Sequence, residues 1–452
     1  MGRGYIVEEV VEKYLANLQA AVGTCLTGLL IGQCSLQRDF VVLAVQTPHR
    51  ESEGQSESRG ASSLDAIDME WVTEHARQVS RMLPGGLSIL GVFLITPSDL
   101  AKEAQNTLRR LVFAIEKHVT KGRLWDLSED DVTDRVTLHI CSKTRKAVCK
   151  TFDVKDPKCS AKPADWKYQS GASLSWPMLT CSVELGLHIP VTGTSLENMD
   201  RCMKDGLKTW AQQIGAGICL LNGKQLADEA DLIPGAKKNT KMTQQTFRAQ
   251  ILVSAIDPQG DQRSTALVQA CSGSLTINGT VHCRAYIHTN KPKAKQAIEA
   301  LKRDIMNTIF CRAEMLLEDL LMNEGESKGP ASGQQSLPHR VFAPLPGTGL
   351  CVCDYMFPDE TTADVAERFK EMLDRDTAEE EIDTSLEPSQ AHASVSSGVA
   401  ENTPDGPLLD SPHLTPTDAS KSQGTFQHYV GAAVAAGIAL LVTATSLLYL
   451  SD

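Results

Sequence analysis

Apolar runs broken by turn residues predict an alternation of strands and helices over the first 130 residues. Each run is rich in Leu, Ile and Val and is closed by Gly or Pro, which is the pattern of a buried strand. Such strands are predicted at residues 24–31, 39–46 and 87–95. Helices are predicted at residues 7–20, at 65–83 and after Ser98. We therefore expect a first α/β domain at residues 1–130.

A second region, residues 131–375, mixes strands with two longer amphipathic helices. The strands are predicted at residues 136–140, 147–154, 179–189, 246–256 and 280–288. The helices begin at Ser195 and near Pro292, and a short amphipathic helix is predicted at 361–374. The polar residues 323–337 read as a flexible insert. The pattern as a whole predicts an α/β (α+β) fold class.

The composition changes after residue 375. Between Asp376 and Lys421 ten acidic residues face one lysine, and Ser, Thr and Pro are frequent. Such a segment cannot bury enough apolar surface to offset the entropy lost on ordering. We expect residues 376–428 to form a disordered acidic tether.

Residues 429–450 form an uncharged apolar run. At about 1.5 Å per residue a helix of this length spans roughly 30 Å, the thickness of a hydrocarbon core. Tyr429 and Tyr449 lie near its ends, where aromatic rings favour the headgroup region. Gly431, Leu440, Leu441 and Leu450 are typical of the run, and only two residues follow it. We expect a tail anchor in the endoplasmic reticulum membrane, with the N-terminal body cytosolic. The alternative is a buried core helix.

The N-terminus supports this orientation. Its first residues are charged and carry no apolar stretch of the kind that defines a secretory signal peptide. Net charge is −12, and no basic run resembles a nucleic-acid footprint. The chain has 13 cysteines without a CxxC motif, and we read most of them as buried thiols. The nearest approach to a metal pair, Cys351-Val-Cys353, has no obvious partners, so neither a metal nor a cofactor is predicted.

The order of elements in the first domain resembles an MPN domain, the fold that hosts the JAMM zinc metallopeptidases. That resemblance implies a glutamate before the first Gly-containing strand and a His-x-His-Pro zinc motif at the end of a later one. In this chain Cys25 stands at the glutamate position, and Leu94 and Thr96 stand where the two histidines belong. Neither Leu nor Thr can replace these ligands. The resemblance therefore implies a metal-free domain that pairs with a related one.

Other catalytic patterns are weak. Cys149, Cys181 or Cys311 could serve as a nucleophile with His139, His188 or His282, but nothing in the sequence links them except residue type. The one Gly-x-Ser-x-Gly match, at residues 325–329, lies in the polar insert without the strand and helix that a nucleophile elbow needs. We expect no enzyme. A cryptic hydrolase is the alternative.

Taken end to end, the sequence resembles the odorant response abnormal protein four family. The segments that carry the likeness are residues 25–33, 84–97 and 339–347, together with the C-terminal apolar run. The resemblance implies a non-enzymatic role at the endoplasmic reticulum in the folding and trafficking of a subset of G-protein-coupled receptors. It also implies a partner, the cysteine protease specific for the ubiquitin-fold modifier.

A tail-anchored vesicle-fusion factor is a rival hypothesis. Fusion proteins need a heptad-patterned helix directly before the anchor. Here the acidic, proline-containing segment occupies that position, which disfavours the rival.

Overall fold

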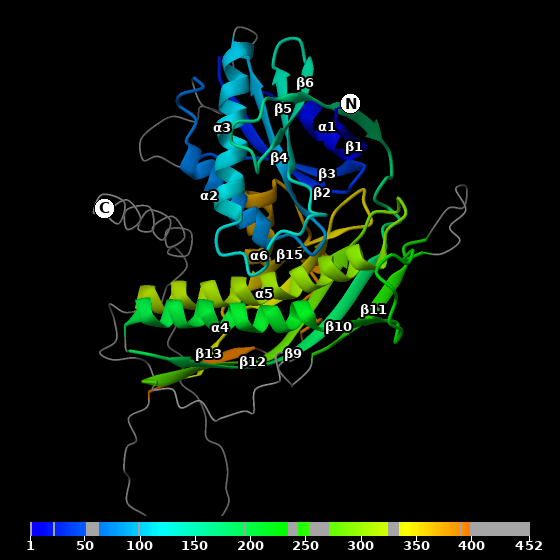
Figure 1. Ribbon diagram of the computed structural model, residues 1–452. Coiled ribbons are helices and arrows are strands. Elements are labelled where there is room, and N and C mark those ends of the chain that lie inside the picture. The colour runs from blue at the N-terminus through cyan, green and yellow to red at the C-terminus, as the bar shows by residue number, and fades with distance from the viewer. Residues whose placement is uncertain are drawn as a thin grey trace, which may run out of the picture. The chain divides into compact units, whose positions relative to one another are not determined.

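The computed structural model describes residues 2–20, 23–50, 63–97, 100–193, 195–233, 243–253, 271–323, 334–387 and 391–397. All of them lie within the unit Met1–Val399. Two sheets organise this unit, an eight-stranded sheet in its upper half and a six-stranded sheet in its lower half (Figure 1).

The first sheet has the strand order β7-β6-β5-β4-β2-β3-β1-β8. Its strands are β1 (Gly4–Glu8), β2 (Leu26–Gln33), β3 (Arg38–Gln46), β4 (Ser88–Thr96), β5 (Asp134–Cys141), β6 (Ala147–Asp153), β7 (Lys162–Pro163) and β8 (Asp165–Gln169). The predicted apolar runs become its central strands β2, β3 and β4, which are buried on both faces.

One short segment joins the two edges of this sheet. Strands β7 and β8 are separated only by Ala164, yet β7 pairs with β6 and β8 pairs with β1. The backbone N–H of Ala164 donates to the carbonyl of Cys149 at 3.2 Å, and the next N–H, of Asp165, donates to the carbonyl of Arg3 at 2.9 Å. The sheet therefore curls until both edges meet the same piece of chain, which leaves no long edge exposed.

Helices fill and cover this curled sheet. Helix α1 (Glu9–Asn17) packs Val11 and Leu15 into the apolar cluster on one face. Helices α2 (Met69–Arg81) and α3 (Ala101–Val119) pack side by side on the other face, as Figure 1 shows. Asp68 caps α2 by accepting a hydrogen bond from the Trp71 backbone N–H at 3.0 Å.

The second sheet has the order β10-β11-β9-β12-β16-β13. Its strands are β9 (Met178–Val191), β10 (Ile218–Leu221), β11 (Thr246–Leu252), β12 (Gly273–Tyr286), β13 (Gln334–Ser336) and β16 (His392–Ser397). Two long helices, α4 (Leu196–Ala216) and α5 (Ala294–Asn323), lie side by side on one face (Figure 1). Along β9 the buried residues alternate with exposed ones, as expected for a sheet covered on one face.

A hairpin and a C-terminal arm complete the unit. The hairpin consists of β14 (His339–Pro344) and β15 (Cys351–Met356), and α6 (Thr362–Leu373) follows it. The arm then passes a 3-10 turn at Glu379–Glu381 and enters the second sheet as β16, between β12 and β13.

Two predicted boundaries are wrong. The boundary near residue 130 fails because β5 pairs with β4 in parallel, so residues beyond 130 complete the first sheet. The disordered tether predicted from residue 376 fails for residues 376–387 and 391–397, because β16 pairs with β12 and Ile382 and Ala393 are buried. The polar composition hid this strand, in which Ala393 is buried among the positions with a described side chain.

Several other predictions are refined. Residues 7–8, predicted as the start of a helix, belong to β1 (Gly4–Glu8), and the predicted insert at 323–337 includes β13. The motif at 325–329, Ser98 and the apolar run 429–450 with its flanking tether residues lie outside the described residues. Within the described ranges, none of the helices combines the length and hydrophobicity that crossing a bilayer requires.

Candidate functional site

The three positions aligned with the JAMM pattern lie together in the first sheet. Leu94 of β4 pairs with Thr27 of β2, which places Cys25, two residues earlier, beside the end of β4. Cys25 and Leu94 both belong to the apolar cluster beneath α2 and α3, and Thr96 is fully buried. The three positions therefore lie close together in the sheet, while the MPN-like fold itself stays a prediction.

A fourth residue, His139 of β5, joins them. Its Nε2 lies 2.9 Å from the Thr96 hydroxyl, and burial lowers the pKa of the imidazole. Only His139 and Cys25 among these four side chains are of a type that binds zinc, and a structural site needs four such ligands. Across the described residues there is no group of three or more His, Cys, Asp and Glu side chains placed to hold a metal ion.

The candidate cysteine nucleophiles are not paired with the candidate histidines. Cys149 packs in the cluster around α1, on the opposite face of the sheet from His139. Burial raises the pKa of Cys149 to about 12 and that of both Cys181 and Cys311 to about 11, so these thiols are poor nucleophiles at neutral pH. His282 contacts the Ser182 hydroxyl at 3.3 Å instead, and His188 contacts Thr276.

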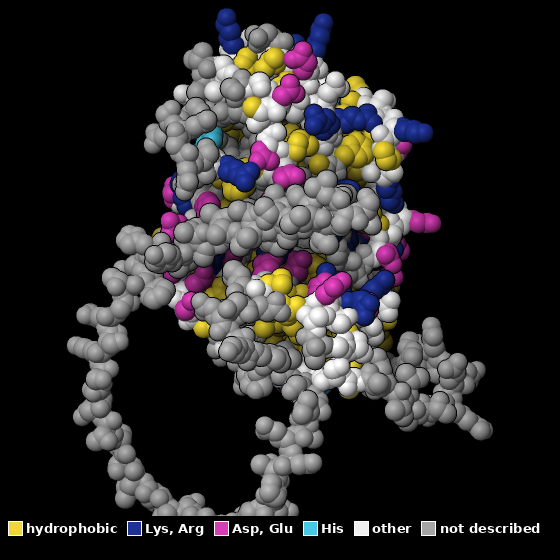
Figure 2. Space-filling view, turned by 90° about the vertical axis from the view of Figure 1, so that its left-hand side faces the viewer, with side chains coloured by type: hydrophobic (Ala, Val, Ile, Leu, Met, Phe, Trp, Pro, Cys, Tyr) yellow, Lys and Arg dark blue, Asp and Glu magenta, His cyan; other side chains and the backbone are white. Residues whose placement is uncertain are grey.

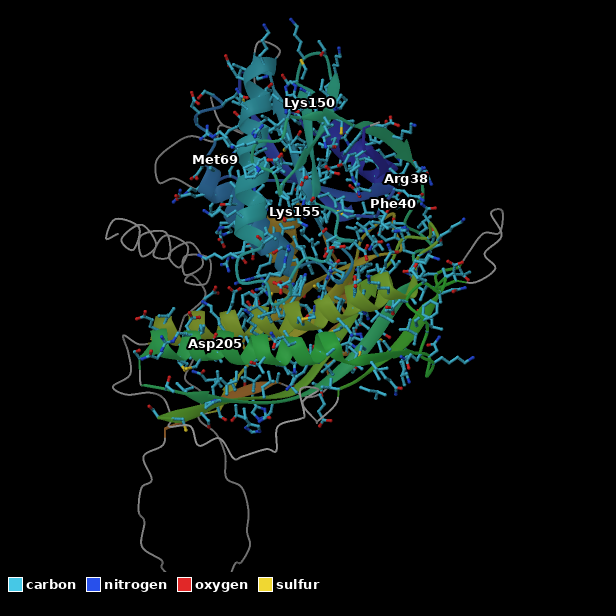
Figure 3. All side chains as sticks on the ribbon, in the orientation of Figure 1. Arg38, Phe40, Met69, Lys150, Lys155 and Asp205 are labelled. Atoms are coloured by element: carbon cyan, nitrogen blue, oxygen red, sulfur yellow. The ribbon has the colours of Figure 1, made fainter. Side chains whose placement is uncertain are left out.

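A set of buried polar residues lies where the two sheets meet. Gln33, the last residue of β2, bridges the two sheets with both the nitrogen and the oxygen of its side-chain amide. Its Nε2 donates to the carbonyls of Gly86 at 2.8 Å and Tyr286 at 2.7 Å, and its Oε1 accepts from the His288 N–H at 2.6 Å. Phe40, labelled in Figure 3, stacks on His288 with the ring centres 5.0 Å apart. We call this contact region the joint.

The turn Pro84-Gly85-Gly86 requires its two glycines because its backbone lies against the end of β12 at the joint. Gly85 exchanges backbone hydrogen bonds with the end of β12, accepting from Tyr286 at 2.9 Å and donating to Arg284 at 2.9 Å. Gly86 has a φ of +82°, and a Cβ there would overlap the carbonyl oxygen of Tyr286. Only a residue without a side chain allows both the conformation and the close approach.

Buried charges lie beside this turn. Arg340 of β14 forms a two-pronged ion pair with Asp304 of α5, at 2.7 and 2.9 Å, and both side chains are 1% exposed. Glu387 of the C-terminal arm binds Arg312 of α5 and accepts the backbone N–H groups of Arg340 at 2.9 Å and His282 at 2.7 Å. The network connects α5, β12, β14 and the arm, so each element fixes the others.

The joint also accounts for the Cys351-Val-Cys353 pair. The two thiols share a face as the strand period predicts, but they have different partners. Cys351 lies 2.9 Å from the Tyr286 hydroxyl, and Cys353 accepts from Arg340 at 3.2 Å. Burial raises the pKa of both thiols. They are packed polar groups of the joint.

Sequence reasoning missed the residues that matter most here. Gln33, Asp304, Arg312, Arg340 and Glu387 are of types that are rarely buried, so each looked like a surface residue. A signal was present for Arg340 alone, because it sits in an otherwise apolar strand. The three described segments that carried the family resemblance, residues 25–33, 84–97 and 339–347, all contribute to the joint.

The fold and the joint define a class of protein: a mixed α/β unit in which a curled sheet and a helix-covered sheet are fused through buried polar contacts. The sequence matches the family described as Odorant response abnormal 4-like over residues 28–384. The chain belongs to this family.

Relatives support the assignment. The chain is 45% identical to "Protein odr-4 homolog" of Mus musculus, with 100% of both chains covered. It is 49% identical to the Xenopus tropicalis protein of that name, covering 85% of this chain and 86% of the relative. It is 22% identical to "Odorant response abnormal protein 4" of Caenorhabditis elegans, covering 73% and 68%.

One solved structure shows a weaker likeness. It is the crystal structure of UfSP from C. elegans, with a TM-score of 0.39, 11% identity, and coverage of 82% of this chain and 56% of that one. A likeness at this level carries no weight for function.

Proposed function

We propose that this protein is a non-catalytic adaptor at the endoplasmic reticulum membrane. In this role it assists the folding and trafficking of a subset of G-protein-coupled receptors and recruits the ubiquitin-fold-modifier-specific cysteine protease to the membrane. Family membership supports the receptor part, since the family is named for the odorant response.

The observation that carries the non-catalytic part is the packing at the JAMM-like positions. Leu94 is fully buried among apolar side chains, and Thr96 is engaged by His139. A water-bearing zinc needs an open coordination position and ionisable ligands. This arrangement offers apolar contact and one neutral hydrogen bond instead.

The partner surface of such an adaptor has to lie outside the central strands. The Gly-containing strands β2 and β4, on which the MPN resemblance rests, lie in the middle of the first sheet and are almost wholly buried. Exposed side chains at the sheet's margins, Val148 and Tyr168, are better positions for mutagenesis. Figure 2 shows basic and acidic side chains interspersed on the face it presents, so charge alone does not mark a partner surface there.

The membrane part rests on residues 429–450. Their uncharged sequence is long enough to span a hydrocarbon core as a helix. Deleting them should move the protein from the membrane pellet to the soluble fraction after cell fractionation. Retention in the pellet after alkaline carbonate washing of the deleted form would contradict the anchor.

The protease partner is tested with purified components. The full chain in detergent and the protease are run separately and mixed by size exclusion with light scattering. The proposal expects a stable one-to-one complex that also forms when residues 429–450 are deleted, because recruitment and anchoring use different parts of the chain. Two independently eluting species at micromolar concentration would rule out direct recruitment.

A further inference from the structure

A cleft of about 370 Å³ lies between α4, α5 and the segment that follows α3. Its apolar floor is formed by Trp125, Ala211, Met306 and Phe310, and its rim carries Arg123, Lys204 and Lys208. In Figure 1 the cyan segment after α3 runs close to the two paired helices. Asp205, labelled on α4 in Figure 3, and Asp126 lie at the exposed margin of the cleft.

The segment is held rigidly over α5. Gly122 has a φ of +79°, and a Cβ there would lie 2.6 Å from the ring of Phe310, so the backbone sits directly on that ring. Lys295 and Arg303 of α5 pair with Asp130 and Asp131, each at 2.7 Å. The cleft wall is therefore fixed by contacts on both sides.

Arg123 is the unusual group in this wall. Its guanidinium lies over the Trp125 ring, 5.5 Å from the ring centre, and forms no ion pair or hydrogen bond with any described residue. The nearby carboxylates are already engaged, Glu116 by Arg135 at 2.9 Å and Asp131 by Arg303. Burial lowers the pKa of Arg123, and the nearby charges act in both directions: Glu116 and Asp131 raise this pKa, whereas Arg135 and Arg303 lower it. The N–H donors of this half-buried guanidinium are therefore available to a carboxylate from another molecule.

We propose that this cleft binds an acidic peptide segment of a partner protein, with a carboxylate on Arg123 and an adjacent apolar side chain on the floor. Arginine presents paired N–H donors that match a carboxylate, and its stacking on an indole pre-orients them. Trp125, Met306 and Phe310 supply an aromatic and thioether surface that accepts varied apolar side chains. At the rim Lys204 is already paired with Asp200 at 2.7 Å, whereas Lys208 has no partner among the described residues and adds attraction.

Asp126 and Asp205 set a limit on the ligand. Both are exposed, and neither pairs with a described cation, so a long polyanion or an anionic lipid surface would meet repulsion at the margin. A short segment with one or two carboxylates next to an apolar residue fits the arrangement of charges better. This distinction separates a peptide from a membrane as the occupant.

The test uses the full chain in detergent and a fluorescein-labelled hexapeptide containing two glutamates followed by leucine and phenylalanine. Fluorescence anisotropy should show saturable binding that an otherwise identical peptide with glutamines lacks. Arg123→Gln should weaken binding about tenfold or more, because a charge-assisted pair is lost. The matched control is Arg50→Gln, which alters another arginine that lies over a tryptophan, Trp71, at 5.9 Å.

Three results would overturn the proposal. They are the absence of saturable binding up to millimolar peptide, equal binding of the glutamine peptide, and equal loss in Arg123→Gln and Arg50→Gln. Binding of phosphatidylserine vesicles that is abolished by Arg123→Gln, without binding of the peptide, would assign the cleft to lipid and also refute it. Thermal unfolding of each variant verifies that it is folded, and the glutamine peptide keeps the test independent of any variant.

Discussion

The Tyr5 hydroxyl reaches across the interior of the curled sheet to the Thr151 hydroxyl, 3.3 Å away, although 146 positions separate the two residues in the chain. Tyr5 belongs to β1 and Thr151 to β6, strands near opposite ends of the strand order. Both residues are buried, and burial raises the pKa of Tyr5. The contact exists only because the segment through β7 and β8 brings the two edges together.

Replacing Tyr5 by Phe should lower the free energy of unfolding by about 1 kcal/mol, the usual net value of one buried hydrogen bond. A double-mutant cycle with Thr151→Val, followed by urea unfolding, isolates the pair. The second substitution should cost less in the Phe background than in the wild type. Strictly additive losses would mean that the two hydroxyls do not interact.

The turn at the joint gives a second prediction. Gly86→Ala should destabilise the protein through positive-φ strain of about 1–2 kcal/mol plus overlap with the Tyr286 carbonyl of about 1–3 kcal/mol. Gly223→Ala is the matched control, because Gly223 has a φ of +77° but nothing within 4 Å of an added Cβ. Denaturant midpoints of the two variants should differ by the overlap alone. Equal midpoints would refute the close approach.

Asp304→Asn should lower the free energy of unfolding strongly, although the two side chains have nearly the same size. It leaves the Arg340 guanidinium buried with an incomplete counter-charge, at a cost of about 3–5 kcal/mol. The exposed pair Lys293–Asp231 serves as control, and Asp231→Asn should leave the unfolding curve unchanged. Replacing Arg340 and Asp304 together by Met and Leu should recover most of the loss. Failure to recover would show that the pair acts through more than its charge.

Acid should weaken the fold through buried histidines. Burial lowers the pKa of His75 to about 4, while the unfolded chain binds that proton near pH 6.5. The unfolded state therefore holds more protons between pH 6.5 and 4, so stability is complete above pH 6.5 and falls as the pH falls towards 4.

For His75 alone the loss between pH 7 and pH 5 is about 2 kcal/mol. His75→Gln should flatten the dependence of unfolding free energy on pH by that amount, whereas His49→Gln, at an exposed position, should not. Parallel pH profiles for the wild type and the His75 variant would contradict the assigned burial.

The C-terminal arm gives a fifth prediction. A chain ending at residue 376 lacks both Glu387 and β16, so Arg312 loses its carboxylate and β12 loses the strand beside it. We expect that form to aggregate or to unfold at least about 3 kcal/mol more readily than a chain ending at residue 399. Identical elution profiles and unfolding midpoints for the two forms would show that the arm is dispensable.

Much of the fold could be predicted from apolar patterning. Strands β2, β3 and β4 follow uninterrupted Leu, Ile and Val runs, and the faces of α4 and α6 follow their apolar spacing. Cys25, Leu94 and Thr96, the three positions that the MPN resemblance singled out, lie together where β2 and β4 pair.

Two strands, β8 and β16, could not be predicted from apolar patterning. Strand β8 reads Asp-Trp-Lys-Tyr-Gln and β16 reads His-Ala-Ser-Val-Ser-Ser, so neither has the apolar content by which a buried strand is recognised. These two strands are held in place by hydrogen bonds to strands far away in the sequence. The ion pair of Arg312 and Glu387 could not be predicted for a related reason, because in the sequence it looks like two unrelated surface charges 75 positions apart.

The pairing of β16 shortens the length of chain between the folded unit and the apolar run at residues 429–450. Only 29 residues, 400–428, separate the end of the folded unit from that run. At about 3.5 Å per residue these can never span more than roughly 100 Å, whatever conformation they adopt. If the chain left the folded unit at residue 376, as the sequence predicted, the maximum span of the connecting segment would be almost twice as long. If the run anchors the chain, the folded unit has to bind a partner on the same membrane within this shorter distance of the bilayer. The effective concentration of that partner is correspondingly greater.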